Sequence, residues 1–120
     1  MIDDMELRKL TNLVDIFCEE RDWTQFHNVK DLAIGISIES AELLQIFLWK
    51  SPEEINNLMG NPLKMENIED EMSDILFYLI RMASLNNINL GDSLRNKIKK
   101  NDAKYPVSKF KGSNKKYNEN

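Results

Sequence analysis

Two pairs of acidic residues lie within apolar stretches of this chain. Glu39 and Glu42 form the first pair, and Glu71 and Asp74 form the second. In each pair the second acid lies three positions after the first. On an α-helix this spacing places both carboxylates on one face, one turn apart. Burying an isolated carboxylate is costly, and clustered carboxylates repel one another. The pattern therefore predicts a cation among the four acids.

The available ligand types favour a hard divalent cation. The chain has one histidine and one cysteine, too few for a histidine-rich zinc site or a di-iron set with Glu-x-x-His motifs. A set of oxygen ligands suits Mg²⁺, with Mn²⁺ as the other choice. Because Mg²⁺ often takes ligands from substrate phosphates, we expect cleavage of a phosphate ester or anhydride. The alternative is that these acids are partly exposed and pair with lysine or arginine, since acids three positions apart are common on helices.

Aromatic residues could stack on the base of a nucleotide, and basic residues could contact its phosphates. The aromatic residues available to stack on a base are Trp23, Phe26, Trp49 and Tyr78. The stretch around Trp23 and Phe26 has no helical period, so these rings either line a pocket or plug the end of a helix bundle. Residues 95–120 carry nine basic and two acidic side chains, although the whole chain has a net charge of −4. This basic segment either contacts the outer phosphates or is a solvated tail, and an acidic body argues against a general nucleic-acid binder.

Helices must position these residues. Only four glycines and three prolines, with long stretches of helical period, predict an all-α fold: a helical bundle of four main helices plus a short connecting helix, completed by oligomerisation. The predicted main helices span residues 5–20, 29–50, 63–84 and 90–104, and the short helix lies between Ser51-Pro52 and Gly60. The second helix is apolar around most of its circumference, more than a small monomer covers. Residues 1–106 are predicted to form the catalytic domain, and residues 107–120 a basic, mobile tail.

Other features bear on compartment and partners. The glycines are isolated, so the chain has no glycine-rich phosphate loop. The single cysteine, Cys18, has no partner for an internal disulfide, which fits a reducing compartment. The N-terminus is acidic, unlike a signal peptide, and no apolar run approaches the roughly 20 residues that cross a bilayer. We therefore expect a cytoplasmic protein with neither a membrane nor a nucleic acid as partner.

The ordered motifs resemble the all-α nucleoside triphosphate pyrophosphohydrolases of the MazG-like superfamily, and within it the dCTP pyrophosphatase branch. The superfamily pattern of Glu-x-x-Glu followed by Glu-x-x-Asp is met by the two acid pairs. The branch resemblance covers residues 17–106. It rests on these segments in order: Glu20-Arg21-Asp22-Trp23, Gln25-Phe26-His27, Phe47 with Trp49, Glu71-x-Ser73-Asp74, Tyr78-Leu79, and Asn101 with Lys104-Tyr105-Pro106.

The resemblance implies a Mg²⁺-dependent hydrolysis between the α- and β-phosphates of a nucleoside triphosphate. The products are a monophosphate and pyrophosphate, the preferred substrate is dCTP or a modified pyrimidine triphosphate, and the role is cleansing of the nucleotide pool. The implied catalytic residues and metal ligands are Glu39, Glu42, Glu71 and Asp74. The implied substrate-binding residues are Trp23, His27, Trp49, Tyr78, Asn101 and Lys104. Family members are oligomers with sites between subunits, so a homotetramer or homodimer is expected.

Two positions depart from the family pattern, and two other functions compete with it. Ile38 stands where the superfamily often has a further acid, and Gln45 where the branch often has glutamate; the loss of that acid would lower metal number or affinity. The first alternative is a non-catalytic helical module that binds a nucleotide or a partner helix. Its binding surface would be the basic tail and the stripe of Met65, Met72 and Met82. The second is a phosphohydrolase that acts on another phosphorylated metabolite.

Overall fold

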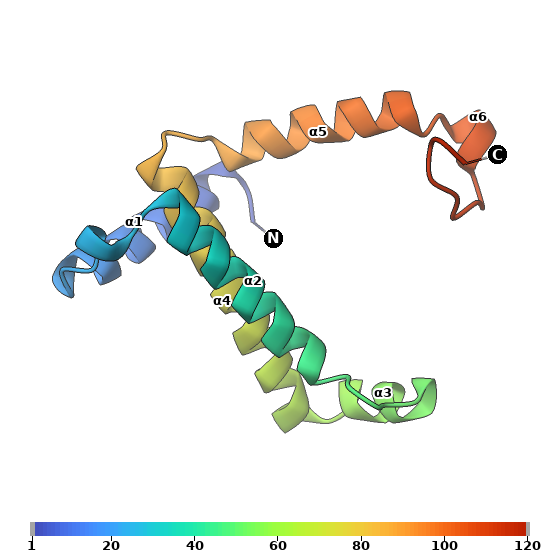
Figure 1. The fold of residues 1–120 in the computed structure, drawn as a ribbon, viewed down its shortest axis with the longest axis horizontal. Coiled ribbons are helices and arrows are strands. Elements are labelled where there is room, and N and C mark those ends of the chain that lie inside the picture. Colours follow the sequence, from blue (N-terminus) through green and yellow to red (C-terminus); the bar gives the residue numbers. More distant parts are fainter. Residues whose placement is uncertain (1, 120) are drawn as a thin grey trace. The chain divides into compact units, whose positions relative to one another are not determined.

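The structure is a computed structural model that describes residues 2–119 (Figure 1). This part of the chain forms helices and turns and contains no strand, which confirms the all-α prediction. The elements in order are α1 (Asp4–Glu20), the 3₁₀ turn η1 (Thr24–Phe26), α2 (Val29–Gln45), α3 (Pro52–Met59), α4 (Pro62–Leu85), α5 (Leu90–Lys104) and α6 (Val107–Phe110). None of these helices is long and apolar enough to cross a membrane.

Side-chain caps begin the helices where the sequence predicts them. The Asn28 side chain accepts from the backbone N–H of Asp31 at the start of α2. Ser51 and Glu54 form a reciprocal capping box at the start of α3, with Pro52 at the first helical position. Such local hydrogen bonds satisfy backbone donors that the helix itself leaves unpaired. Helix starts are therefore encoded within a few neighbouring residues.

Helix α2 ends at Gln45, five residues before the predicted end at Lys50. The backbone beyond it tightens into turns with bonds between residues three apart, such as Leu48 N–H to Gln45 carbonyl. Trp49 then adopts a left-handed conformation with φ of 61°. The proline at position 52 also disfavours a helical conformation for the residue before it, and Ser51 is extended. The predicted helix over 29–50 was therefore too long.

The chain divides into two compact units, one up to Asn87 and the other from Ile88 onward. In the first unit α4 is central and packs against α2, α1 and α3. Helix α2 runs alongside α4 for most of its length (Figure 1). The buried apolar residues of this unit are Cys18, Leu32, Ile68, Ile80 and Ala83.

In the second unit, the segment after α5 folds back on the end of that helix. The ring of Tyr105 packs edge-on against Phe110 and Tyr117, at centroid distances of 5.0 and 6.1 Å. The Lys104 ammonium lies 4.9 Å from the centre of the Tyr117 ring. Residues 107–119 thus contain a helical turn and aromatic contacts, while the domain boundary after residue 106 and the mobility of the tail stay predictions.

Candidate active site

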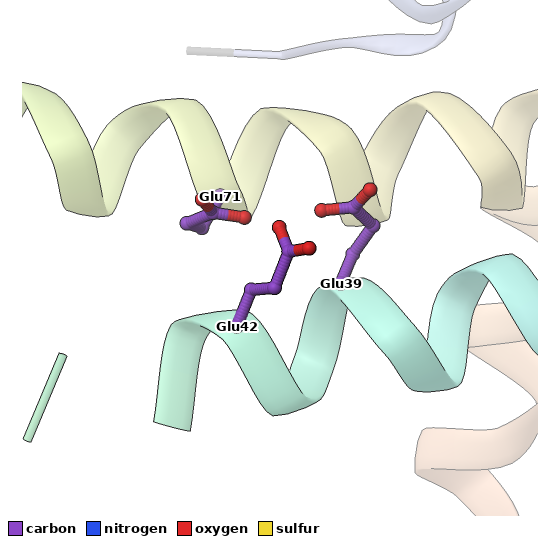
Figure 2. Close-up of side chains that lie close together, drawn as sticks. All are labelled: Glu39, Glu42 and Glu71. Atoms are coloured by element: carbon purple, nitrogen blue, oxygen red, sulfur yellow. The ribbon is translucent and has the colours of Figure 1, made fainter. Parts of the chain in front are cut away.

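Three carboxylates from two helices converge in the first unit. Glu39 and Glu42 project from α2 toward α4, and Glu71 projects from α4 toward them (Figure 2). One oxygen from each of the three lies within 4.8 Å of the others. Facing helices with acids three positions apart bring about this arrangement, as the spacing predicts.

Two oxygens of these acids are buried without any hydrogen-bond donor. They are Oε2 of Glu39 and Oε2 of Glu71. Burial, followed by contact with the carboxylates of Glu42 and Glu71, raises the pKa of Glu39 to about 7. Burial raises the pKa of Glu71 as well. A buried acceptor without a donor is costly, and a hard divalent cation satisfies such oxygens directly, so the residues present fit a Mg²⁺ or Mn²⁺ ion.

A pocket of about 480 Å³ lies beside these acids. Its polar wall includes Glu39 and Asp74, so the fourth predicted acid faces the pocket but lies outside the set of three converging oxygens. Its other lining residues are Leu13, Val14, Phe17, Trp23, Phe77 and Tyr78. A pocket of this size with mainly aromatic and aliphatic walls and acids at one side suits a planar heterocycle attached to a charged group.

The aromatic wall of this pocket is a continuous chain of ring contacts. Trp23 packs edge-on against Phe17 at 5.5 Å, Phe17 against Phe77 at 5.7 Å, and Phe77 against Tyr78 at 5.7 Å. Tyr78 fits closely over Gly35 of α2, where an added Cβ would lie 2.9 Å from the phenol ring. Burial and then the charge of Glu39 raise the pKa of Tyr78, so its hydroxyl stays a hydrogen-bond donor.

A protein-family model described as MazG-like matches residues 34–119, which include all four predicted acids. The chain belongs to the MazG-like family. This confirms the resemblance inferred from the sequence, and it places the acid pairs of α2 and α4 within the part of the chain that the family shares.

Curated relatives of this MazG-like chain carry the name dCTP pyrophosphatase 1. The protein from Bos taurus is 36% identical over 101 residues, covering 84% of this chain and 60% of the relative. The protein from Homo sapiens is 32% identical over 103 residues, covering 86% and 61%. The chain thus spans about three fifths of the length of the curated relatives it matches. Among solved structures, a pyrophosphatase from Archaeoglobus fulgidus has a TM-score of 0.77 and 34% identity, covering 88% of this chain and 95% of that one.

The predicted substrate-binding residues are not all brought together by this MazG-like fold. Trp23 and Tyr78 line the pocket. His27 does not line it, and its ring contacts that of Trp23 at a centroid distance of 6.5 Å. Trp49 is 91% exposed in the turn after α2.

The two remaining predicted substrate-binding residues, Asn101 and Lys104, lie in the last turn of α5. That helix belongs to the second unit of the chain. Their role in substrate binding stays a prediction.

Sequence reasoning missed several residues around the pocket. Leu13, Val14 and Phe17 of α1 line it. Asp15, in the middle of that apolar stretch, pairs with Arg81 of α4 at 2.7 Å. An acid within an apolar run was the signal that singled out Glu39 and Glu71. The same signal could have singled out Asp15, but not its partner, which lies 66 positions away in the chain.

Proposed function

We propose that this chain is a divalent-metal-dependent nucleoside triphosphate pyrophosphohydrolase that cleaves between the α- and β-phosphates. Its preferred substrate is dCTP or a modified pyrimidine deoxynucleotide, and its role is to cleanse the nucleotide pool. Family membership and relatives named dCTP pyrophosphatase 1 support this proposal. The observation that carries it is the convergence of Glu39, Glu42 and Glu71 beside an aromatic pocket.

The residues of the proposed site form two groups, acids that would bind the metal and aromatic residues that would bind the base. Glu39, Glu42, Glu71 and Asp74 would hold Mg²⁺, with Mn²⁺ as a substitute, through oxygen ligands alone. A divalent cation at such a site neutralises phosphate charge and favours ionisation of water. Trp23, Phe17 and Tyr78 would contact the base from the pocket wall that they line and fix its orientation.

In the proposed reaction a water oxygen forms a bond to the α-phosphorus while the bond from that phosphorus to the bridging oxygen breaks. The attacking water gives its proton to one carboxylate of the acid set, and pyrophosphate leaves. The aromatic wall contributes by holding the base, so that the α-phosphate stays beside the acids throughout.

A panel of nucleoside triphosphates tests this function. The protein is incubated with each substrate and Mg²⁺, and the products are separated by ion-exchange chromatography. We expect monophosphate and pyrophosphate, with the highest kcat/KM for dCTP or its 5-substituted derivatives. Release of orthophosphate contradicts the cleavage site, and nucleotide binding by calorimetry without turnover under Mg²⁺ or Mn²⁺ favours the non-catalytic module.

A matched pair of variants links the turnover to the acids. Glu42→Gln keeps the size of the side chain and removes its charge, so we expect at least a 100-fold loss of kcat with an unchanged helical circular dichroism spectrum. Glu53→Gln makes the same change on exposed α3 and is expected to retain full activity. Equal turnover by the two variants would remove Glu42 from the site.

We also propose that copies of the chain associate through the exposed apolar surface of α2, the turn that follows it, and α4. Leu44 is 71% exposed in the single chain, and Ile34, Ile38, Leu48, Met72 and Leu79 are exposed with it. Leu79 and Met72 also line an apolar cavity of about 590 Å³. Apolar exposure on this scale is typical of an interface, and a homodimer or homotetramer would cover it.

A further inference from the structure

A buried arginine joins three segments next to the pocket. Arg81 of α4 is 2% exposed. One terminal nitrogen donates to Oδ1 of Asp15 on α1 at 2.7 Å, and the other donates to Oγ1 of Thr24 at 2.7 Å. The Nε–H donates to Nδ1 of His27 at 3.0 Å. The guanidinium therefore holds α1 and the segment 24–27 against α4.

The hydrogen bond from Nε–H of Arg81 determines which ring nitrogen of neutral His27 carries the proton. A guanidinium has N–H donors and no acceptor, so Nδ1 of His27 must present its lone pair to Arg81. The ring proton of neutral His27 then resides on Nε2. Burial and, after it, the charge of Arg81 lower the pKa of His27. Asp15 also faces this site from α1, but its Oδ1 binds the guanidinium and its Oδ2 accepts from Ser84.

The fixed imidazole contacts one ring of the aromatic wall. The His27 ring packs at 66° to the ring of Trp23, with 6.5 Å between centroids, and Trp23 lines the pocket. Val14, next to Asp15 in the chain, lines the same pocket. Neither Arg81 nor His27 is itself a lining residue of the pocket.

We propose that Arg81 and His27 are positioning residues that set the place of Trp23 in the pocket, with His27 fixed as its Nε2–H tautomer by Arg81. The inference rests on the proposed function only in that the pocket receives the base of a nucleotide. The ring contact between His27 and Trp23 is what distinguishes this role from one confined to the stability of the fold.

The tautomer is measured directly because His27 is the only histidine in the chain. Long-range ¹H–¹⁵N spectra of protein labelled with ¹⁵N-histidine should show one Nε2–H tautomer at neutral pH. They should also show nuclear Overhauser contacts from the His27 ring to the Trp23 indole. A protonated Nδ1 or a tautomer mixture in the wild-type chain overturns the proposal.

Two variants test the positioning. Arg81→Lys keeps the charge but loses the planar fork, and it is expected to release His27 into a tautomer mixture and to shift the Trp23 indole N–H resonance. Should this buried substitution prevent folding, His27→Asn decides, since its amide oxygen still accepts from Arg81 but the ring is gone. The control is Lys30→Gln, an exposed change three positions along the chain, which should leave the Trp23 resonance in place. An unchanged Trp23 resonance in His27→Asn overturns the proposal.

Kinetics with dCTP and Mg²⁺ then connect Trp23 to substrate. We expect His27→Asn to raise KM by roughly 3- to 10-fold and to leave kcat within about 2-fold, since a ring contact of this kind affects ground-state and transition-state binding alike. A shifted Trp23 resonance with an unchanged KM overturns the positioning role. If the wild-type chain cleaves no triphosphate, the proposed function fails, and the spectra alone decide whether Arg81 and His27 hold Trp23.

Discussion

At the scale of single residues, Glu39 connects protonation, metal binding and folding. Its Oε2 is buried without a donor, and the folded chain raises its pKa from 4.5 to about 7. The folded state therefore binds the proton of Glu39 more tightly than the unfolded state does. A divalent cation bound as proposed would compete with that proton for the same oxygen atoms.

The pH dependence of stability follows from this shift. The Glu39 contribution to the free energy of unfolding is fully present below pH 4.5 and is lost as the pH rises through about 7. We expect thermal or urea unfolding of the metal-free chain to show decreasing stability from pH 5 to pH 8. Added Mg²⁺ should restore more stability at pH 8 than at pH 5.5, because metal ligands must be ionised.

Glu39→Gln separates this contribution from the other titrating groups. The variant carries a neutral side chain of the same size at every pH, so its stability should decline less steeply between pH 5 and pH 8. Part of the slope should remain, since burial also raises the pKa of Glu71. Identical slopes for the wild type and the variant would contradict the assignment to Glu39.

At the scale of elements, the close approach of α2 and α4 depends on Gly35. A Cβ at this position would lie 2.9 Å from two atoms of the Tyr78 ring, closer than real contacts allow. Tyr78 lines the pocket. The absence of one side chain on α2 therefore lets a ring on α4 take its place in the aromatic wall.

We expect Gly35→Ala to destabilise the fold and to displace Tyr78. Overpacking costs about 1–3 kcal/mol, whereas alanine gains about 1 kcal/mol over glycine within a helix, so the net loss should lie between about 0 and 2 kcal/mol. Urea unfolding measures this loss, and a raised KM for dCTP would report the moved ring. Gly60→Ala is the control: a Cβ there meets only backbone oxygens at 3.6 and 3.8 Å, so its stability should change by less than that of Gly35→Ala.

The elements that the sequence predicted well are those encoded locally. Helix starts at Asn28 and Ser51 depend on hydrogen bonds within three residues, and the acid pairs depend on spacing along one helix. The end of α2 was missed because the left-handed backbone at Trp49 leaves no local sequence signal. The Arg81 network was missed for another reason, since Asp15 lies 66 positions away in the chain.

At the scale of the whole molecule, exposed apolar side chains predict self-association. We expect the wild-type sedimentation coefficient to rise with protein concentration or to correspond to a stable dimer or tetramer. Leu79→Lys places a charge at the apolar cavity that Leu43 and Leu76 also line and should shift the chain toward monomer. Leu63→Lys, an exposed change at the start of α4 and outside that cavity, is the control. A purely monomeric wild-type chain would contradict the prediction.

The labelling rate of the buried Cys18 thiol would report local opening of the fold around the end of α1. Cys18 is the single cysteine and is fully buried at the end of α1, where its carbonyl accepts from the N–H of Trp23. Burial raises the pKa of this thiol, so a thiol-reactive dye should label it only during openings that separate α1 from its neighbours. The labelling rate would then measure how often the segment that joins Cys18 to Trp23 opens. We expect Mg²⁺ with a non-hydrolysable dCTP analogue to slow it at least 5-fold, and equal rates with and without ligand would show that binding does not restrain this end of the pocket.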